Sequence, residues 1–147
     1  VDTVQALSSK YGLEIELAPC SDPGQVYSTA IALMRKVDAV YTGLDNLVAE
    51  NLETVLKASR ETRTPVFSGD TESVQRGALA TIALQMFDIG KLTGQMVADV
   101  LEGSKPSDMP VRVIAEGLPV ANHETVKIFN IDEALIEKLG VQYIEPR

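Results

Sequence analysis

The sequence VDAVYTGLDN at residues 37–46, with its counterpart TPVFSGD at residues 64–70, decides the fold of this chain. Each stretch is a short apolar run, rich in residues typical of β-strands, that stops at a glycine and is followed by an aspartate. Helical patterns precede and follow both runs. Parallel strands bring their carboxyl ends to one edge of a sheet, where open α/β sheets bind ligands. We therefore expect Asp45 and Asp70 to face one crevice.

Length and composition limit the class of protein. With 147 residues, 45% of them apolar and 23% charged, the chain suits one ordered domain with a sizeable core. Its formal net charge of −8 argues against a nucleic-acid backbone or an anionic membrane as partner. The apolar runs are too short to span a bilayer. The single Cys20 excludes an internal disulfide.

The remaining elements follow from periodicity and capping signals. Helices are predicted over 3–11, 22–35, 46–62, 86–102 and 130–139, and strands over 13–17, 37–42, 66–68, 77–84 and 111–114. The 37–42 strand is apolar almost throughout, so we expect both of its faces to be covered. Repeated β–α units indicate a doubly wound, mostly parallel α/β sheet. The chain opens inside a helix without the strand that normally feeds it, which suggests a missing N-terminal part.

Two glycines and two capping residues refine this prediction. Gly90 and Gly94 lie four residues apart in the 86–102 helix, where each costs up to about 1 kcal/mol relative to alanine. Either another backbone packs closely there or both are tolerated surface glycines. Asp22 and Asn130 are the predicted N-caps of the helices that they precede.

Several motifs, in this order and spacing, are similar to one protein family. They are DAVY at 38–41 with DN at 45–46, PVFSGD at 65–70, SVQRGALAT at 73–81, DIG at 88–90 with GQM at 94–96, LEGSKP at 101–106 with MPV at 109–111, and Asn130 with EKLGV at 137–141. The chain resembles substrate-binding proteins of ABC transporters related to the tryptophan/tyrosine-type binding proteins, which have the type I periplasmic-binding-protein fold. The resemblance covers nearly the whole chain.

This resemblance implies a two-lobed clamshell of about twice this length, with the present chain as its C-terminal half. Residues 1–84 and 109–147 would form the second lobe, and the helix within 85–108 would cross the hinge to pack on the first. The protein would bind a small solute, an amino acid or related organic acid, and deliver it to an ABC permease. It would be periplasmic or extracellular and membrane-associated through the transporter.

The expected ligand contacts combine strand ends with helix starts. They are Ser21, Thr42, Asp45, Asn46, Gly69, Asp70 and Ser73. Asp45 also suits an N-cap, and Asp70 suits either a ligand ammonium group or a cap. Ser73 suits a ligand carboxylate or an ordinary capping role. Leu44 stands where the family usually has threonine, and Met86-Phe87 stands where many members have two tyrosines, so an aromatic amino acid is in doubt as the solute.

Other functions remain as alternatives. A ligand-sensing regulatory domain shares this fold, but no basic DNA-binding helix pair is present in the sequence. A metal-dependent enzyme using Asp45 and Asp70 would need a nearby lysine or a glycine-rich phosphate loop, and the sequence has neither. His123 and Cys20 have no partner for a triad or metal cluster, so no cofactor, metal or catalytic residue is expected. If the first lobe is missing, the apolar 86–102 helix would favour a homodimer, domain exchange or refolding of the helix onto its own lobe.

Overall fold

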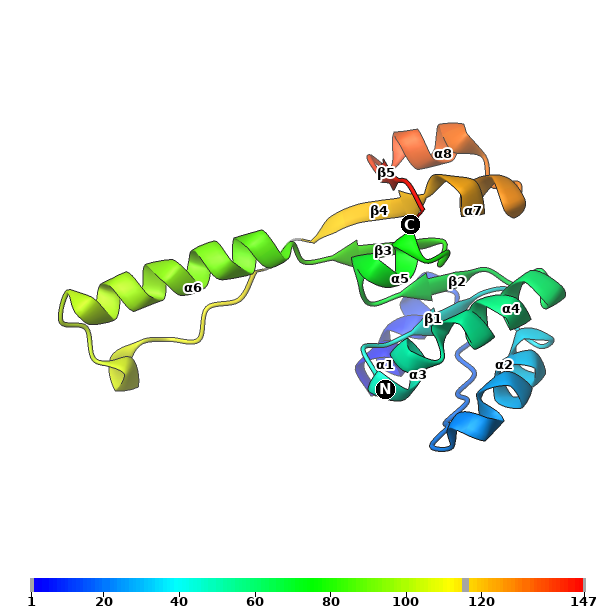
Figure 1. Ribbon diagram of the computed structural model, residues 1–147, viewed down its shortest axis with the longest axis horizontal. Coiled ribbons are helices and arrows are strands. Elements are labelled where there is room, and N and C mark those ends of the chain that lie inside the picture. Colours follow the sequence, from blue (N-terminus) through cyan, green and yellow to red (C-terminus); the bar gives the residue numbers. More distant parts are fainter. Residues whose placement is uncertain (1, 115–116, 147) are drawn as a thin grey trace. The chain divides into compact units, whose positions relative to one another are not determined.

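The chain forms a mixed α/β structure with one five-stranded, mostly parallel sheet (Figure 1). The computed structural model describes residues 2–114 and 117–146. The strands follow the order β1-β2-β3-β4-β5, so each strand neighbours the next one along the chain. Two compact units, residues 1–66 and 67–147, divide the chain within β2.

The first unit is mainly helical. Its elements are α1 (Asp2–Tyr11), the 3-10 turn η1 (Pro23–Gln25), α2 (Val26–Met34), β1 (Val40–Thr42), α3 (Asn46–Glu50) and α4 (Leu52–Thr62). Helix α2 packs against α4. Both helices contribute buried apolar side chains, which are Val26 and Met34 from α2 and Leu52, Val55, Leu56 and Ala58 from α4.

A buried polar connection ties the end of α2 to the entry of β2. The Thr64 hydroxyl donates to the Met34 carbonyl at 2.9 Å, and the Ser59 hydroxyl donates to the Thr64 carbonyl at 2.6 Å. The Val40 amide donates to the Pro65 carbonyl at 2.9 Å, where β1 begins. Because a buried polar group without a partner is costly, these bonds stabilise this connection.

The second unit contains most of the sheet. Its elements are β2 (Val66–Ser68), α5 (Thr71–Gln75), β3 (Ala80–Ala83), α6 (Met86–Leu101), the 3-10 turn η2 (Pro106–Asp108), β4 (Leu118–Asn122), α7 (His123–Ile128), α8 (Glu133–Lys138) and β5 (Gln142–Ile144). Strands β2 and β3 are parallel, as are β4 and β5, whereas β3 and β4 are antiparallel.

The core of the second unit lies where α7 and α8 pack near β4. Leu79, Ala121, Val126 and Ile136 form a buried apolar cluster there. Asn122 is 1% exposed, and its side-chain amide donates to the Val74 carbonyl at 2.8 Å. This side chain therefore fixes the end of α5 to the end of β4.

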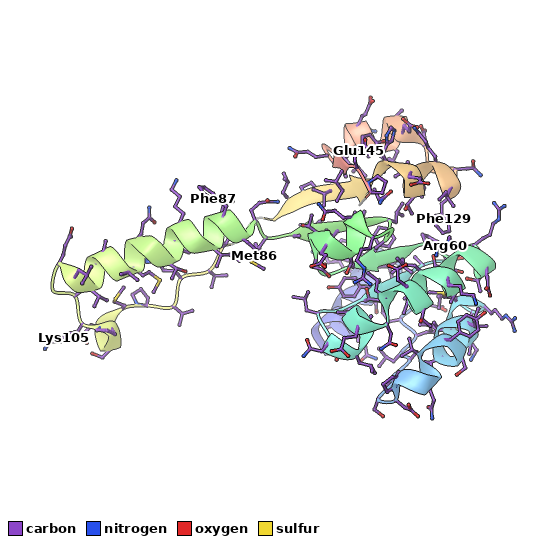
Figure 2. All side chains as sticks on the ribbon, in the orientation of Figure 1. Arg60, Met86, Phe87, Lys105, Phe129 and Glu145 are labelled. Carbon is purple, nitrogen blue, oxygen red and sulfur yellow. The ribbon has the colours of Figure 1, made fainter. Side chains whose placement is uncertain are left out.

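Helix α6 extends away from β3 and β4 within the second unit (Figure 1). None of its described side chains is buried. Figure 2 shows Met86 and Phe87 near the start of α6 and Lys105 just beyond its far end. The segment after η2 returns beside the helix, and Arg112 forms an ion pair with Asp99 at 2.7 Å.

Two predicted strands are wrong and two others need correction. Residues 13–17 and 111–114 form no strand, although their side-chain pattern suits one. The predicted 77–84 strand shortens to β3 because Gly77 has a φ of +122° and ends the turn after α5. The 37–42 strand is not covered on both faces, since Tyr41 is 69% exposed. Strands β4 and β5 were not predicted.

The helices agree better with the sequence, with three differences. The predicted 46–62 helix breaks at Asn51, whose φ of −106° and ψ of 19° separate α3 from α4. The last helix is capped by Asp132 rather than Asn130, which has a left-handed φ of 52°. Helix α7, which begins at His123, was not predicted.

Candidate functional site

The end of β1 carries the first group of predicted site residues. Asp45 is the N-cap of α3, and its carboxylate accepts a hydrogen bond from the Val48 amide at 3.1 Å. Asn46 is the exposed first residue of α3, and Thr42 is the half-buried last residue of β1. The capping role expected for Asp45 is therefore confirmed, and its second carboxylate oxygen has no hydrogen bond to the described residues.

The loop before η1 carries the second group. Ser21 is exposed there, and the Cys20 thiol donates to the Asp22 carbonyl at 3.4 Å. Asp22 accepts from the Gly24 amide at 2.9 Å, so it caps the first turn as predicted. Pro23 follows at the first position of this turn, which suits its fixed φ.

The end of β2 carries the third group, in the second unit. Asp70 is the N-cap of α5, and its two carboxylate oxygens accept from the Ser73 amide and the Ser73 hydroxyl, both at 2.7 Å. The Ser68 hydroxyl donates to the Asp70 carbonyl at 2.9 Å. Ser73 is 7% exposed, and both of its donors, the amide and the hydroxyl, are used in bonds to Asp70. Asp70 and the intervening Gly69 are half-buried and remain reachable from solvent.

Each unit also has exposed apolar side chains near the strand ends. In the first unit, Tyr41 is 69% exposed and Leu44 is 80% exposed beside Asp45. In the second unit, Leu84, Met86 and Phe87 are exposed where β3 leads into α6. Exposed apolar groups next to a few fixed polar ones are typical of surfaces that bind small organic molecules. Tyr41 was missed by sequence reasoning because the 37–42 strand was expected to be covered on both faces.

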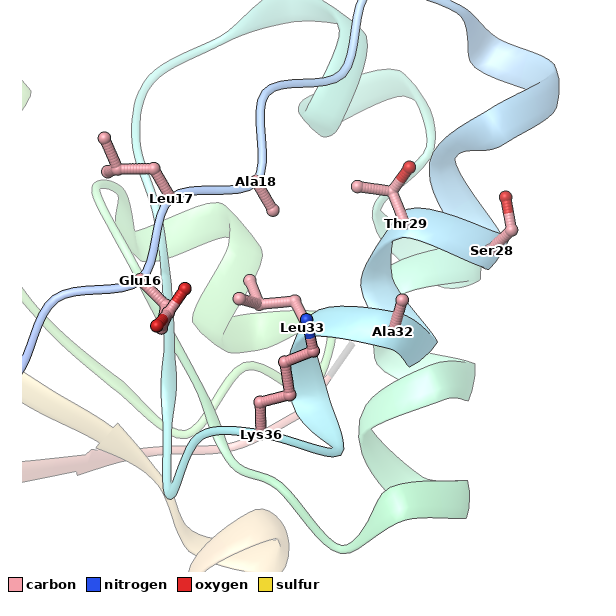
Figure 3. Close-up of a pocket in the computed structure, with 8 residues that line it drawn as sticks. All are labelled: Glu16, Leu17, Ala18, Ser28, Thr29, Ala32, Leu33 and Lys36. Carbon is pink, nitrogen blue, oxygen red and sulfur yellow. The ribbon is translucent and has the colours of Figure 1, made fainter.

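Two of the surface cavities formed by the described residues are lined by none of the predicted site residues. One, of 320 Å³, lies between the extended segment 16–18 and α2 (Figure 3). The other, of 480 Å³, lies at the end of α6 against the loop 103–112.

The described part of the chain offers little catalytic chemistry. No group of three or more His, Cys, Asp or Glu side chains there could hold a metal ion. The single histidine, His123, lies 3.7 Å from a Glu133 oxygen through Nε2 and stacks on Tyr143 with ring centroids 4.5 Å apart. Burial raises the pKa of the Tyr143 hydroxyl, with Glu133 and Glu137 adding to the effect. This cluster packs the C-terminal strand on α7 and α8.

A second tyrosine belongs to the packing of α2 on α4. The Tyr27 hydroxyl donates to a Glu61 carboxylate oxygen at 2.5 Å, and the Lys57 ammonium lies 5.3 Å from the Tyr27 ring centre. The hydrogen bond to Glu61 raises the pKa of the Tyr27 phenol above its usual value. This contact joins α2 and α4 at the surface, in addition to their buried apolar side chains.

Comparison with known proteins decides the family. The sequence matches the ABC transporter substrate binding protein family over residues 1–142. The chain belongs to this family. Such substrate-binding proteins are typically extracellular or periplasmic. Among the described residues, the helices are too short or too polar to cross a bilayer.

Individual relatives of this chain support the same family. It is 26% identical over 145 residues to a tyrosine-binding protein of Clostridioides difficile, covering 99% of this chain and 41% of that one. An ABC domain from Streptococcus pneumoniae in complex with L-Trp is 30% identical with a TM-score of 0.82, covering 97% of this chain and 49% of that one. A ligand-free, open substrate binding protein with adhesive properties from Clostridium difficile is 27% identical with a TM-score of 0.80, covering 99% and 49%.

These relatives confirm the predicted family, the α/β fold and the absence of an enzyme function. They are substrate-binding proteins rather than enzymes. The chain spans about half the length of the relatives that it matches. The expected ligand contacts at Asp45, Asn46, Asp70 and the other four positions stay predictions.

Proposed function

We propose that this substrate-binding chain is one half of the solute-binding component of an ABC uptake transporter. The observation that carries the proposal is the family match over residues 1–142. The relatives whose names state a ligand bind amino acids, namely tyrosine and L-Trp. The complete protein would bind an amino acid or a related organic acid between two lobes and deliver it to an ABC permease. Membrane association would come from contact with that permease.

The division of the chain between two lobes rests on the exposure of α6. We assign residues 1–84 and 109–147 to the second lobe and residues 85–108 to packing on the first. Helix α6 has no buried residue, and a Cβ atom at Gly90 or Gly94 would meet no atom within 4 Å. Phe87 and Leu101 on the same helix are 80% and 83% exposed. An apolar helix face of this kind favours a partner surface, which the first lobe would supply.

The solute contacts proposed for this chain are Ser21, Thr42, Asp45, Asn46, Gly69, Asp70 and Ser73. Ser73 would contribute through the lone pairs of its hydroxyl, because both of its donors bond to Asp70. Asp45 supports this role because one carboxylate oxygen is left for a ligand ammonium group after capping α3. Asp70 would act through the remaining lone pairs of its two bonded oxygens.

Three apolar residues stand at positions where family members commonly have hydroxyl-bearing residues, and they bear on the kind of amino acid that is bound. Leu44 is 80% exposed, and Met86 and Phe87 are 82% and 80% exposed. None of the three offers a strong hydrogen-bonding group to a phenol or an indole. A site that lacks such partners gives no preference for a hydroxylated side chain. We therefore propose an amino acid with an apolar side chain as the preferred solute.

The proposal is tested on the complete two-lobed protein. Isothermal titration with each amino acid and with small carboxylic acids should give saturable binding for at least one apolar amino acid. Asp45→Ala should weaken that binding by about tenfold or more, because a charge-assisted hydrogen bond contributes roughly 1.5–3 kcal/mol. Asp132→Ala, which removes the cap of α8 and lies far in sequence from all seven proposed contacts, is the matched control. No response to any amino acid or organic acid would refute the transport function.

A further inference from the structure

Asn122 is a buried side chain that forms hydrogen bonds to two different elements of the second unit. It is the last residue of β4 and the N-cap of α7. Its side-chain oxygen accepts from the Thr125 amide at 2.9 Å, and its side-chain nitrogen donates to the Val74 carbonyl of α5 at 2.8 Å. The amide group of asparagine has an acceptor and a donor on separate atoms, so it fits both partners at once.

Thr125 provides a second connection between the same two elements. Its hydroxyl donates to the Gly77 carbonyl at 3.1 Å, and its side chain is 6% exposed. Gly77 lies just beyond α5, and Val74 within α5 is fully buried. Carbonyl groups at a helix end lack intrahelical partners, so donors from another element can fix where that end lies. Asn122 and Thr125 therefore form a clamp from the start of α7 onto the end of α5.

The clamp is adjacent to the turn that carries Asp70. Val74 directly follows Ser73, whose amide and hydroxyl donate to the two carboxylate oxygens of Asp70. Helix α5 has only five residues, and a helix of that length is not stable on its own. Its position is therefore set by contacts from other elements, which are its packing on β3 and β4 and the clamp. Since Ser73 moves with α5, the clamp also fixes the orientation of the Asp70 carboxylate.

We propose that Asn122 is a positioning residue for the solute contact at Asp70, with Thr125 as its second support. The role rests on the proposed function, in which Asp70 binds the solute. Because Asn122 and Thr125 are both buried, they act through α5 and not by touching the solute. Loss of the bond to Val74 allows the end of α5 to move, and the carboxylate of Asp70 then no longer keeps a single orientation. Solute affinity falls while the protein stays folded.

Two substitutions separate this clamp from helix capping. Asn122→Ser keeps an oxygen that can cap α7, but its side chain is too short to reach Val74. Thr125→Val removes the hydroxyl donor to Gly77 and keeps the branched shape of the side chain. Ile136→Val is the matched control, because it destabilises the same unit from a buried position in α8 that has no bond to α5.

Amide exchange in the 147-residue chain measures the effect on the turn. The Ser73 amide should exchange about tenfold faster in Asn122→Ser and in Thr125→Val, and at the parent's rate in Ile136→Val. Urea titration checks that each variant is folded under the conditions of exchange. The parent's rate in Asn122→Ser, or an equal acceleration in Ile136→Val, would overturn the proposal. If Asn122→Ser does not fold, the rate in Thr125→Val decides in its place.

Solute affinity is measured on the complete two-lobed protein by isothermal titration with L-leucine, L-tryptophan and L-tyrosine. Each probe that binds the parent should bind Asn122→Ser about tenfold more weakly, because the charge-assisted contact at Asp70 is lost or weakened. Ile136→Val should keep the parent's affinity. Equal affinity of Asn122→Ser and the parent would overturn the positioning role and leave the proposed function intact. A parent protein that binds none of the probes, or any other amino or organic acid, would refute the proposed function and the positioning role together.

Discussion

Removing the Asp70 side chain should destabilise the second unit more than an ordinary cap substitution does. Its carboxylate accepts hydrogen bonds from both the amide and the hydroxyl of Ser73, each at 2.7 Å. Loss of an N-cap costs about 1 kcal/mol. The Ser73 hydroxyl, in a side chain that is 7% exposed, would also lose its acceptor, which adds roughly 1–3 kcal/mol. Asp70→Ala should therefore lower the free energy of unfolding by about 2–4 kcal/mol.

Urea titration followed by circular dichroism measures this loss, with two variants for comparison. Asp70→Asn keeps an oxygen for the Ser73 amide, so it should cost less than about 1 kcal/mol. Asp45→Ala removes a cap with a single bond, at 3.1 Å to the Val48 amide, and should cost about 1 kcal/mol. Equal urea midpoints for Asp70→Ala and the parent chain would refute the reasoning. Since Asp70→Asn keeps the cap but loses the charge, its solute affinity in the complete protein separates capping from binding.

Three further predictions concern the surface of α6, the contact between Tyr27 and Glu61, and Gly117. The 147-residue chain should self-associate through α6, and Phe87→Glu should shift its mass by light scattering towards the monomer; a monomeric parent chain at about 100 μM would contradict this. The Tyr27 phenol should ionise above pH ~10 because it donates to Glu61, so this contact stabilises the fold below that pH and is lost as the pH rises through the raised pKa. Ultraviolet titration should show one tyrosine returning towards pH ~10 in Glu61→Gln, and an unchanged curve would disprove the link. Gly117→Ala should cost about 1–3 kcal/mol in thermal unfolding, because its Cβ would lie 2.9 Å from Ile82 Cγ2 and 3.1 Å from the Ala83 carbonyl oxygen; an unchanged midpoint would mean that the strand ends can separate freely.

Sequence patterns predicted the parts of this fold whose partners are local. Asp22 and Asp70 each cap a turn within three residues, and the 86–102 helix matches α6 to within one residue. The strand before Asp70 was predicted with its observed bounds, whereas the strand before Asp45 begins at Val40 rather than at residue 37. Local hydrogen bonds and helix periodicity are set by nearby residues, so they are visible in the chain itself.

The errors occur where distant contacts decide the outcome. Residues 13–17 and 111–114 have strand-like side chains, but strand formation requires a neighbour, and the described structure gives them none. Strand β4 contains Pro119 and Asn122, which are unfavourable in strands, and pairing with β3 overrides this preference. Asn122 is buried and bonded to Val74, 48 residues away along the chain. Such a role has no local signal.

The candidate site was only partly visible in the sequence. The positions of Asp45 and Asp70 at strand ends followed from the glycine and aspartate after each apolar run. That Ser73 would give both donors to Asp70 did not follow, because the choice between a cap and a ligand depends on side-chain geometry. The exposure of Tyr41 was missed for a different reason, since apolar strands were taken to be covered on both faces.

The pairing of β3 with β4 has a consequence for how α6 is connected. Ala83 lies directly opposite Leu118, so residues 84–117 leave and rejoin the sheet at one point, as a hairpin loop does. The register of both strands is set by four residue pairs on the sheet side of that point. The helix can therefore be regarded as a long insertion at a hairpin tip. Its length affects the entropy of loop closure only logarithmically, so a short turn in its place would leave the strands aligned.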